Sequence, residues 1–221
     1  ISAGGSTVRS LIINRFGGDA IELAGGGGNT IEGCFIGTDS TGAIDLGNLG
    51  NGIRINDSSD NNIGGAGILS RNLISGNDAN GIFISGVEFG NGNEIVNNII
   101  GADLSRTADL GNSQNGIEIR FYGNTIGGAT PDLTNVISGN DSNGIRLEDA
   151  SINLVRNNFI GTNLSGSLDL GNGGSGVYLA GEAADNTVGG GNTIAFNSTG
   201  VNIEAAATGN NLTENSIFSN D

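Results

Sequence analysis

The residues of this 221-residue chain that are best suited to bind a cation are aspartates in a Gly-rich loop that occurs three times, at positions 37–48, 101–112 and 161–172. The three copies carry, in order, Asp39 and Asp45, Asp103 and Asp109, and Asn163 and Asp169. Hard cations take about six to eight oxygen ligands, so two carboxylates in one loop could begin a Ca²⁺ site. The alternative, which we favour, is that these residues form Asx turns and accept hydrogen bonds from loop amides. No other cofactor is expected.

A second set of chemically useful side chains follows the motif Gly-Ile-x-Ile, in which apolar and variable positions alternate. Such alternation is typical of a strand with one buried face, and in a stack of parallel strands the variable position faces outward. The outward ladder reads Glu22, Arg54, Phe83, Glu118, Arg146, Tyr178 and Asn202. Opposite charges, and arginine beside an aromatic ring, are favourable neighbours. We expect Glu22–Arg54 and Glu118–Arg146 pairs, with each arginine beside Phe83 or Tyr178.

This ladder has two interpretations. The plainer one is that it sets the strand register and keeps the surface soluble. The sharper one is a flat ligand strip for a glycan or a surface protein, made of Arg54, Phe83, Glu118, Arg146 and Tyr178.

The elements that position these side chains belong to a repeat. The motif Asn-x-(Ile/Val/Leu) recurs with spacings from 24 residues (186 to 210) to 33 residues (153 to 186). Periods of roughly 20 to 50 residues indicate stacked repeats, and each unit here contains three short β-branched strands. One unit cannot bury its own apolar face, but stacked units share a continuous core. We therefore predict a right-handed parallel β-helix of about seven turns, in preference to a β-sandwich.

Asparagine occupies three further columns at the corners between the predicted strands. The first contains Asn29, Asn61, Asn93, Asn124, Asn153, Asn186 and Asn210; the second contains Asn72, Asn98, Asn135, Asn158, Asn192 and Asn215, with Cys34 in the same place in one turn; the third contains Asn48, Asn77, Asn112, Asn140, Asn172, Asn197 and Asn220. An amide side chain both donates and accepts, so stacked asparagines can bond to the turns above and below. We interpret them as structural ladders.

The composition limits the partners and the location of the protein. The net charge is −15, which disfavours nucleic acid, and no run of residues is apolar enough to insert into a membrane. The single cysteine, Cys34, cannot form an internal disulfide. We expect one β-helix domain over residues 1–221, secreted or at the cell surface. Its open sheet edges predict either further solenoid or self-association through the ends.

Several phrases in the sequence resemble a known family. GNTIEGCFIGTDSTGAIDLGNLGNGIRI, NLISGNDANGIFISG and NVISGNDSNGIRL are similar to the Gly/Asn-rich right-handed β-helix repeats of large bacterial exported proteins, within the pectate-lyase-like superfamily. The resemblance covers nearly the whole chain and implies the fold. It does not select an activity, because lyases, hydrolases, epimerases, adhesins and inert stalks share this architecture.

The residue types present then decide the expected function. The resemblance implies that hydrolases and alginate-type epimerases of this fold rely on Asp combined with His, and this chain has no His. A lyase commonly uses Arg or Lys and a cation; here Lys is absent and no basic groove is apparent. We therefore predict a structural or adhesive module rather than an enzyme. The alternative is a carbohydrate-active or glycan-binding β-helix whose site is unrecognised or lies outside this segment.

Overall fold

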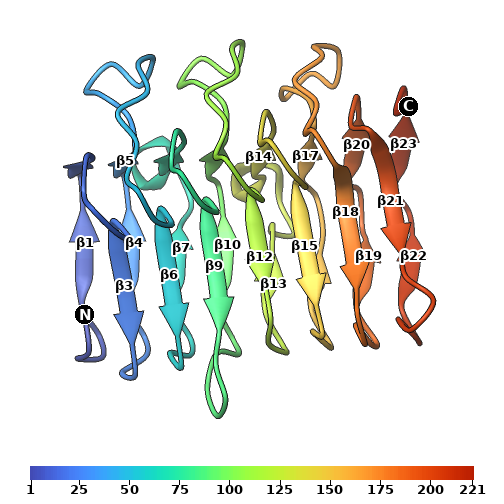
Figure 1. Ribbon diagram of the computed structural model, residues 1–221, viewed down its shortest axis with the longest axis horizontal. Helices are drawn as coiled ribbons and strands as arrows, with labels where there is room; N and C mark the ends of the chain where they lie inside the picture. Colours follow the sequence, from blue (N-terminus) through green and yellow to red (C-terminus); the bar gives the residue numbers. More distant parts are fainter.

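The computed structural model describes residues 1–221 and contains a single right-handed parallel β-helix, which confirms the predicted fold. Successive turns stack along one axis from the N-terminus to the C-terminus, and each turn contributes one strand to each of three parallel sheets (Figure 1). The sheets are called A, B and C in the order in which the chain passes through them. Sheets A and B each contain eight strands, and sheet C contains seven.

Sheet A contains β1 (Thr7–Arg9), β4 (Thr30–Glu32), β7 (Asn62–Gly64), β10 (Glu94–Val96), β13 (Thr125–Ile126), β16 (Leu154–Val155), β19 (Thr187–Gly189) and β22 (Asn211–Thr213). Sheet B contains β2 (Ile12–Ile13), β5 (Phe35–Ile36), β8 (Leu73–Ile74), β11 (Ile99–Ile100), β14 (Val136–Ile137), β17 (Phe159–Ile160), β20 (Thr193–Ala195) and β23 (Ser216–Phe218). Sheet C contains β3 (Ile21–Ala24), β6 (Ile53–Asn56), β9 (Ile82–Ser85), β12 (Ile117–Ile119), β15 (Ile145–Glu148), β18 (Ser175–Ala180) and β21 (Thr199–Ile203).

The core is a column of aliphatic side chains from all three sheets. A continuous cluster of 27 buried residues runs through the turns, and most of its members are isoleucines with no exposed surface. The strand register stacks identical side chains of successive turns: Ile31 pairs with Ile63 in sheet A, and Ile36 pairs with Ile74 in sheet B. Each fully buried aliphatic side chain contributes roughly 1.5–3 kcal/mol to folding.

The predicted asparagine columns form hydrogen-bonded ladders. The Oδ1 atom of Asn61 accepts hydrogen bonds from both the backbone N–H and the Nδ2 group of Asn29, at 3.0 and 2.9 Å. Asn61 repeats this arrangement with Asn93 one turn further on. These amides are buried, so the ladder satisfies corner N–H groups that have no strand partner. The second and third columns behave in the same way.

Insertions leave the helix alternately at two corners. The three loops at 37–48, 101–112 and 161–172 project together from one edge (Figure 1), and each is closed by an antiparallel bridge such as Thr38 with Asp45. The turns between them carry an insertion after sheet A that contains the short 3₁₀ helices η1 (Ile68–Ser70) and η2 (Pro131–Leu133). The sequence predicts both insertions, but not the 3₁₀ helices.

The two ends of the described chain differ. At the first turn Leu11 and Phe16 occupy ladder positions and are about half exposed, at 51% and 54%. At the last turn Asn210, Asn215 and Asn220 continue all three ladders. Self-association through these ends stays a prediction. No helix here has the length and apolar character needed to cross a membrane.

Candidate functional site

The outer face of sheet C brings the residues of the ligand strip into one ladder. Parallel register places Arg54 beside Phe83, Phe83 beside Glu118, and Glu118 beside Arg146. Arg146 in turn pairs with Tyr178. The neighbours along the strip are therefore as the alternation predicts, because a period of two leaves the same position outward in every turn. The side-chain contacts between them differ in part from the prediction.

The N-terminal part of the strip departs from the expected arginine–aromatic contact. Arg54 lies 3.9 Å from Glu22, as expected, and 3.8 Å from Asp19, but it does not cover Phe83. The guanidinium carbon over that ring, 5.7 Å from its centroid, belongs to Arg120. Two carboxylates on one side of Arg54 outweigh a cation–π contact on the other, which is worth about 0.5–1 kcal/mol at an exposed site.

Glu118, in the middle of the strip, is almost completely buried. Its Oε1 atom accepts a hydrogen bond from Arg120 Nε at 2.7 Å, and its Oε2 atom accepts one from Asn115 Nδ2 at 3.0 Å. The bond to Glu118 raises the pKa of Arg120 above its ordinary value. The expected Glu118–Arg146 pair does not form, because Arg120 lies two residues away on the same strand edge and Arg146 pairs with Glu148 instead.

The C-terminal part of the strip joins an arginine, a phenol and a carboxylate. The guanidinium carbon of Arg146 lies 5.6 Å from the ring centroid of Tyr178, as predicted. The Tyr178 hydroxyl donates a hydrogen bond to Oε1 of Glu204, whose Oε2 accepts the N–H of Gly181 at 2.7 Å. The hydrogen bond to Glu204 raises the pKa of Tyr178, and the same bond lowers the pKa of Glu204. The phenol is therefore protonated and the carboxylate ionised at neutral pH.

Three charged residues of this face are absent from the strip defined by sequence. Arg120, Glu148 and Glu204 each follow the Gly-Ile-x-Ile motif by one residue; Glu148 is the last residue of β15, and Arg120 and Glu204 come directly after β12 and β21. Each lies two residues after the variable position of its motif, so extending the alternation by one step would have found them. The sequence offers no comparable sign of which arginine pairs with which carboxylate, because both neighbours are equally near in register.

A fourth polar ladder, which sequence inspection missed, borders this face. Asn51 donates its backbone N–H and its Nδ2 group to Asp19, and Asn80 donates the same two groups to Asn51. Asn115 and Asn143 continue the series. Its polarity is opposite to that of the other ladders, since each turn donates back to the preceding one. This ladder holds Asn115 in place and thereby orients Glu118.

The loop aspartates are engaged in local turns. In the first loop Asp39 accepts hydrogen bonds from the Thr41 hydroxyl at 2.8 Å and from the amides of Ala43 and Ile44 at 3.2 Å. Asp103 accepts the N–H groups of Thr107 and Ala108 in the second loop. The remaining three aspartates each accept one amide two residues further along the chain: Asp45, Asp109 and Asp169.

Hydrogen bonds from nearby amides to the loop aspartates are the geometry expected if these residues form Asx turns. The structure contains no group of three or more His, Cys, Asp or Glu side chains placed to hold one metal ion. Hydrogen bonds from Thr41, Ala43 and Ile44 lower the pKa of Asp39 despite the opposing effect of desolvation. Calcium binding by Asp39, Asp45, Asp103, Asp109 and Asp169 stays a hypothesis.

Chemically, the sheet C face is an open platform rather than a closed pocket. Neither cavity of the molecule includes residues of the strip. The Nε atoms of Arg54 and Arg146 are buried and have no hydrogen-bond partner. The face thus presents partly exposed arginine side chains, a protonated phenol and carboxylates that are held by hydrogen bonds.

Comparison with solved structures identifies enzymes that share this fold. The periplasmic alginate epimerase AlgG matches with a TM-score of 0.64 and 16% identity, over 96% of this chain and 44% of its own. The mannuronan C-5 epimerase AlgE4 A-module of Azotobacter vinelandii matches with a TM-score of 0.64 and 14% identity, over 97% of this chain and 54% of its own. The AlgE6 A-module of the same organism matches with a TM-score of 0.59. No protein-family model and no curated protein sequence matches.

These matches share the parallel β-helix fold of this chain, which spans about half the length of the matched structures. They contradict the sequence-based prediction that the chain is not an enzyme, because the matched proteins are epimerases. That prediction took the lack of His and Lys as excluding catalysis. It gave no weight to the contacts among Tyr178, Glu204 and Arg146, which only the folded register brings together.

Proposed function

We propose that this chain is an exported carbohydrate-active β-helix that binds a linear polysaccharide along the outer face of sheet C and transfers protons at a sugar ring. The observation that carries the proposal is the cluster of Arg146, Tyr178 and Glu204, whose hydrogen bonds and ring contact are described above. The carbohydrate-active enzymes with the same fold support the substrate class, and the word periplasmic in the name of AlgG supports export.

The shape of the face suits a linear polymer. Strands in the sheet are spaced about 4.8 Å apart, close to the length of one sugar unit, so neighbouring units can meet equivalent positions on neighbouring turns. The strip extends over several turns of sheet C, and neither cavity of the molecule includes its residues. The partly exposed guanidinium groups of Arg54 and Arg146 can donate to acceptor oxygens on the ligand, such as ring hydroxyls or a uronate carboxylate.

The cluster is equipped for acid–base chemistry beside a carboxylate. In the proposed step, Arg146 binds the uronate carboxylate and stabilises the charge that develops when the neighbouring C–H bond breaks. The Tyr178 oxygen takes the carbon-bound proton while its own phenolic proton passes to Glu204. The electron pair of the C–H bond is then held by the carboxylate as an enolate. Return of a proton to the carbon restores the sugar, whereas departure of the 4-linked oxygen gives an unsaturated end and a free 4-hydroxyl: the oxygen takes a proton from Tyr178 as Glu204 returns its proton to the phenol.

The net charge of −15 opposes the approach of a polyuronate from a distance. Added salt screens that repulsion, so binding of an acidic polymer should strengthen between low and moderate ionic strength. A neutral polysaccharide should show no such dependence.

The test is to incubate the chain in D₂O with mannuronan, polygalacturonate and a neutral β-glucan, and to follow ring-proton exchange by NMR and unsaturated ends by ultraviolet absorbance. We expect exchange or elimination on a polyuronate and a loss of roughly 100-fold or more in Tyr178→Phe, the usual size of an acid–base contribution. Tyr122→Phe removes the other tyrosine of the chain and should keep full turnover. Turnover unchanged in Tyr178→Phe, or none on any polymer, would refute the proposal.

A further inference from the structure

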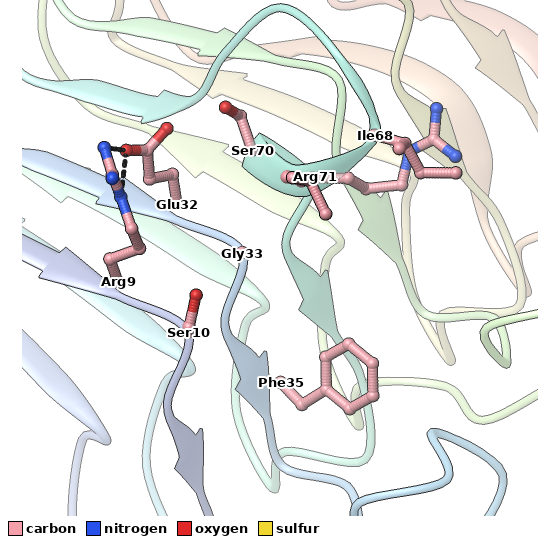
Figure 2. A pocket seen from close by; sticks show the side chains of 9 residues that line it. Arg9, Ser10, Glu32, Gly33, Phe35, Ile68, Ser70 and Arg71 are labelled. Carbon is pink, nitrogen blue, oxygen red and sulfur yellow. Dashed lines mark hydrogen bonds and ion pairs between the residues drawn. The ribbon is translucent and has the colours of Figure 1, made fainter.

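The larger cavity of the molecule lies away from sheet C, at the corner where sheet A passes into sheet B in the first three turns. It has a volume of about 420 Å³, within the roughly 300–1,000 Å³ range of small-ligand sites. The insertion that contains η1 overhangs the two preceding turns and forms one wall (Figure 2). Gly33 permits this close approach: its φ is +64°, and a Cβ atom there would lie 2.5 Å from the Leu69 carbonyl oxygen.

The polar wall of the cavity is an ion pair. Arg9 Nε donates to Oε1 of Glu32 at 2.6 Å, and Glu32 is only 9% exposed whereas the Arg9 side chain is 66% exposed. Hydrogen bonding by Ser70, followed by that of Arg9, lowers the pKa of Glu32, so the carboxylate is ionised at neutral pH. The Ser10 hydroxyl lies nearby in Figure 2. This wall offers donors and acceptors but no net charge, because the cation and the carboxylate neutralise each other.

The opposite wall is apolar and faces solvent. Ile68 and Leu69 on η1 are 76% and 87% exposed, and Phe35 contributes an aromatic ring. Large aliphatic side chains exposed to this degree, next to an ion pair whose carboxylate is buried, mark a surface suited to a ligand. The nearby Arg71 does not add a cation here, since it points away in Figure 2 and donates to Asn97 Oδ1 at 2.9 and 2.7 Å.

The corresponding corner two turns further on lacks this site. The insertion with η2 occupies the same position in the repeat, but the column that holds Arg9 and Glu32 continues there with Gly64 and Val96. Without an ion pair beneath the overhang, no cavity forms at that corner. The cavity is thus a local departure from the repeat and not a consequence of stacking.

We propose that this cavity binds one pyranose unit of a neutral glycan. A pyranose carries hydroxyl groups on its edge, which can both donate to Glu32 and accept from Arg9 and the serines, and an apolar C–H face that suits Phe35, Ile68 and Leu69. An anionic sugar is disfavoured because its carboxylate would lie beside the ionised Glu32 carboxylate in the same cavity. The site is separate from sheet C and does not depend on the function proposed for that face.

The experiment is a ligand-observed NMR titration of the full chain with methyl mannoside, methyl galactoside, methyl glucoside and glucuronate. We expect saturable binding of at least one neutral glycoside with a Kd of about 1 mM, the range for a single sugar. Glu32→Gln and Leu69→Ser should each weaken it by at least about tenfold, the loss of a charge-assisted hydrogen bond or of an apolar contact. Glu94→Gln, exposed on sheet A, and Val87→Ser, 87% exposed like Leu69, are the matched controls.

Circular dichroism melting verifies that each variant is folded, and Gly33→Ala gives an independent perturbation through the overhang. Binding that survives Glu32→Gln, Leu69→Ser and Gly33→Ala would place the sugar elsewhere and overturn the proposal. So would a titration in which none of the three neutral glycosides saturates, or one in which glucuronate alone binds.

Discussion

The Tyr178 hydroxyl on β18 donates a hydrogen bond to the Glu204 carboxylate one turn further along sheet C. The two residues are 26 positions apart in sequence and meet only because β18 and β21 are parallel neighbours. Donation to an ionised carboxylate stabilises the phenol over the phenolate, which raises the pKa of Tyr178. The same bond fixes the phenol against the Arg146 guanidinium.

Removing the carboxylate should lower the pKa of Tyr178. In Glu204→Gln, the main cause of the raised pKa is lost, and we expect the value to return toward about 10, that of an unperturbed tyrosine. The measurement is a spectrophotometric pH titration in a Tyr122→Phe background, where Tyr178 is the one remaining tyrosine. An unchanged midpoint in Glu204→Gln would show that the bond does not control the titration.

An interior ladder asparagine should be costly to remove. Asn112 Oδ1 accepts both the backbone N–H and the Nδ2 group of Asn77, and all of these groups are buried. Asn112→Ala leaves two buried donors unsatisfied, so we expect a loss of roughly 2–4 kcal/mol in the free energy of unfolding. Urea unfolding gives the value, and Asn62→Ala, at an exposed position, is the control. Equal stabilities of the two variants would contradict a structural role for the ladder.

Cys34 lies one turn before Asn72, the first asparagine of the second ladder, and asparagine at position 34 should extend the ladder. The backbone N–H of Cys34 donates to Asn72 Oδ1 at 2.9 Å, while its thiol lies 3.8 Å from the Val8 carbonyl, where Asn72 Nδ2 contacts the equivalent Ile31 carbonyl in the next turn. We expect Cys34→Asn to add about 1 kcal/mol. The corresponding rise in Tm is about 2–4 °C for a chain of this length. Cys34→Ala provides the control and should give no rise.

The amide chemical shifts of the corner loop after β9 should follow the protonation of Asp57. The Oδ1 atom of Asp57 accepts the N–H groups of Val87, Glu88 and Phe89 at 2.7, 3.0 and 3.3 Å. Bonds from Glu88, then Val87 and Phe89, lower the pKa of Asp57, so its stabilising effect is present above the unfolded pKa and disappears as the pH falls through the folded one. Amide chemical shifts of the loop should therefore change at a pH below about 3.9. Asp57→Asn should abolish that transition.

Calcium should not alter the melting temperature. The Asp39 and Asp103 carboxylates are already occupied by loop amides and hydroxyls, and few free oxygens remain for a cation. The measurement is thermal unfolding in about 5 mM calcium and in excess chelator. This calcium concentration is enough to fill even the weakest class of extracellular calcium sites, which bind in the millimolar range. A higher Tm in calcium that is lost in Asp39→Asn would instead assign the loops as calcium sites.

The sequence by itself determined the fold of this protein. Ile53 and Ile55 flank a variable residue, as do Ile82 and Ile84, and recurrence of this pattern in every turn leaves a parallel stack as the way to bury all of the isoleucines. The repeat also fixed the ladder neighbours and the corners at which insertions leave, because in a stack one turn sets the register of the next.

Tertiary structure alone decided the chemistry of the surface. Outward side chains have several neighbours at similar distances, so small differences in ion-pair geometry determined that Glu118 pairs with Arg120 and Arg146 with Glu148. The Tyr178–Glu204 contact and the cavity beneath η1 likewise depend on how one turn lies over the next. Burial of apolar groups follows a periodic pattern that can be read along the chain, whereas a site depends on particular side-chain directions in three dimensions.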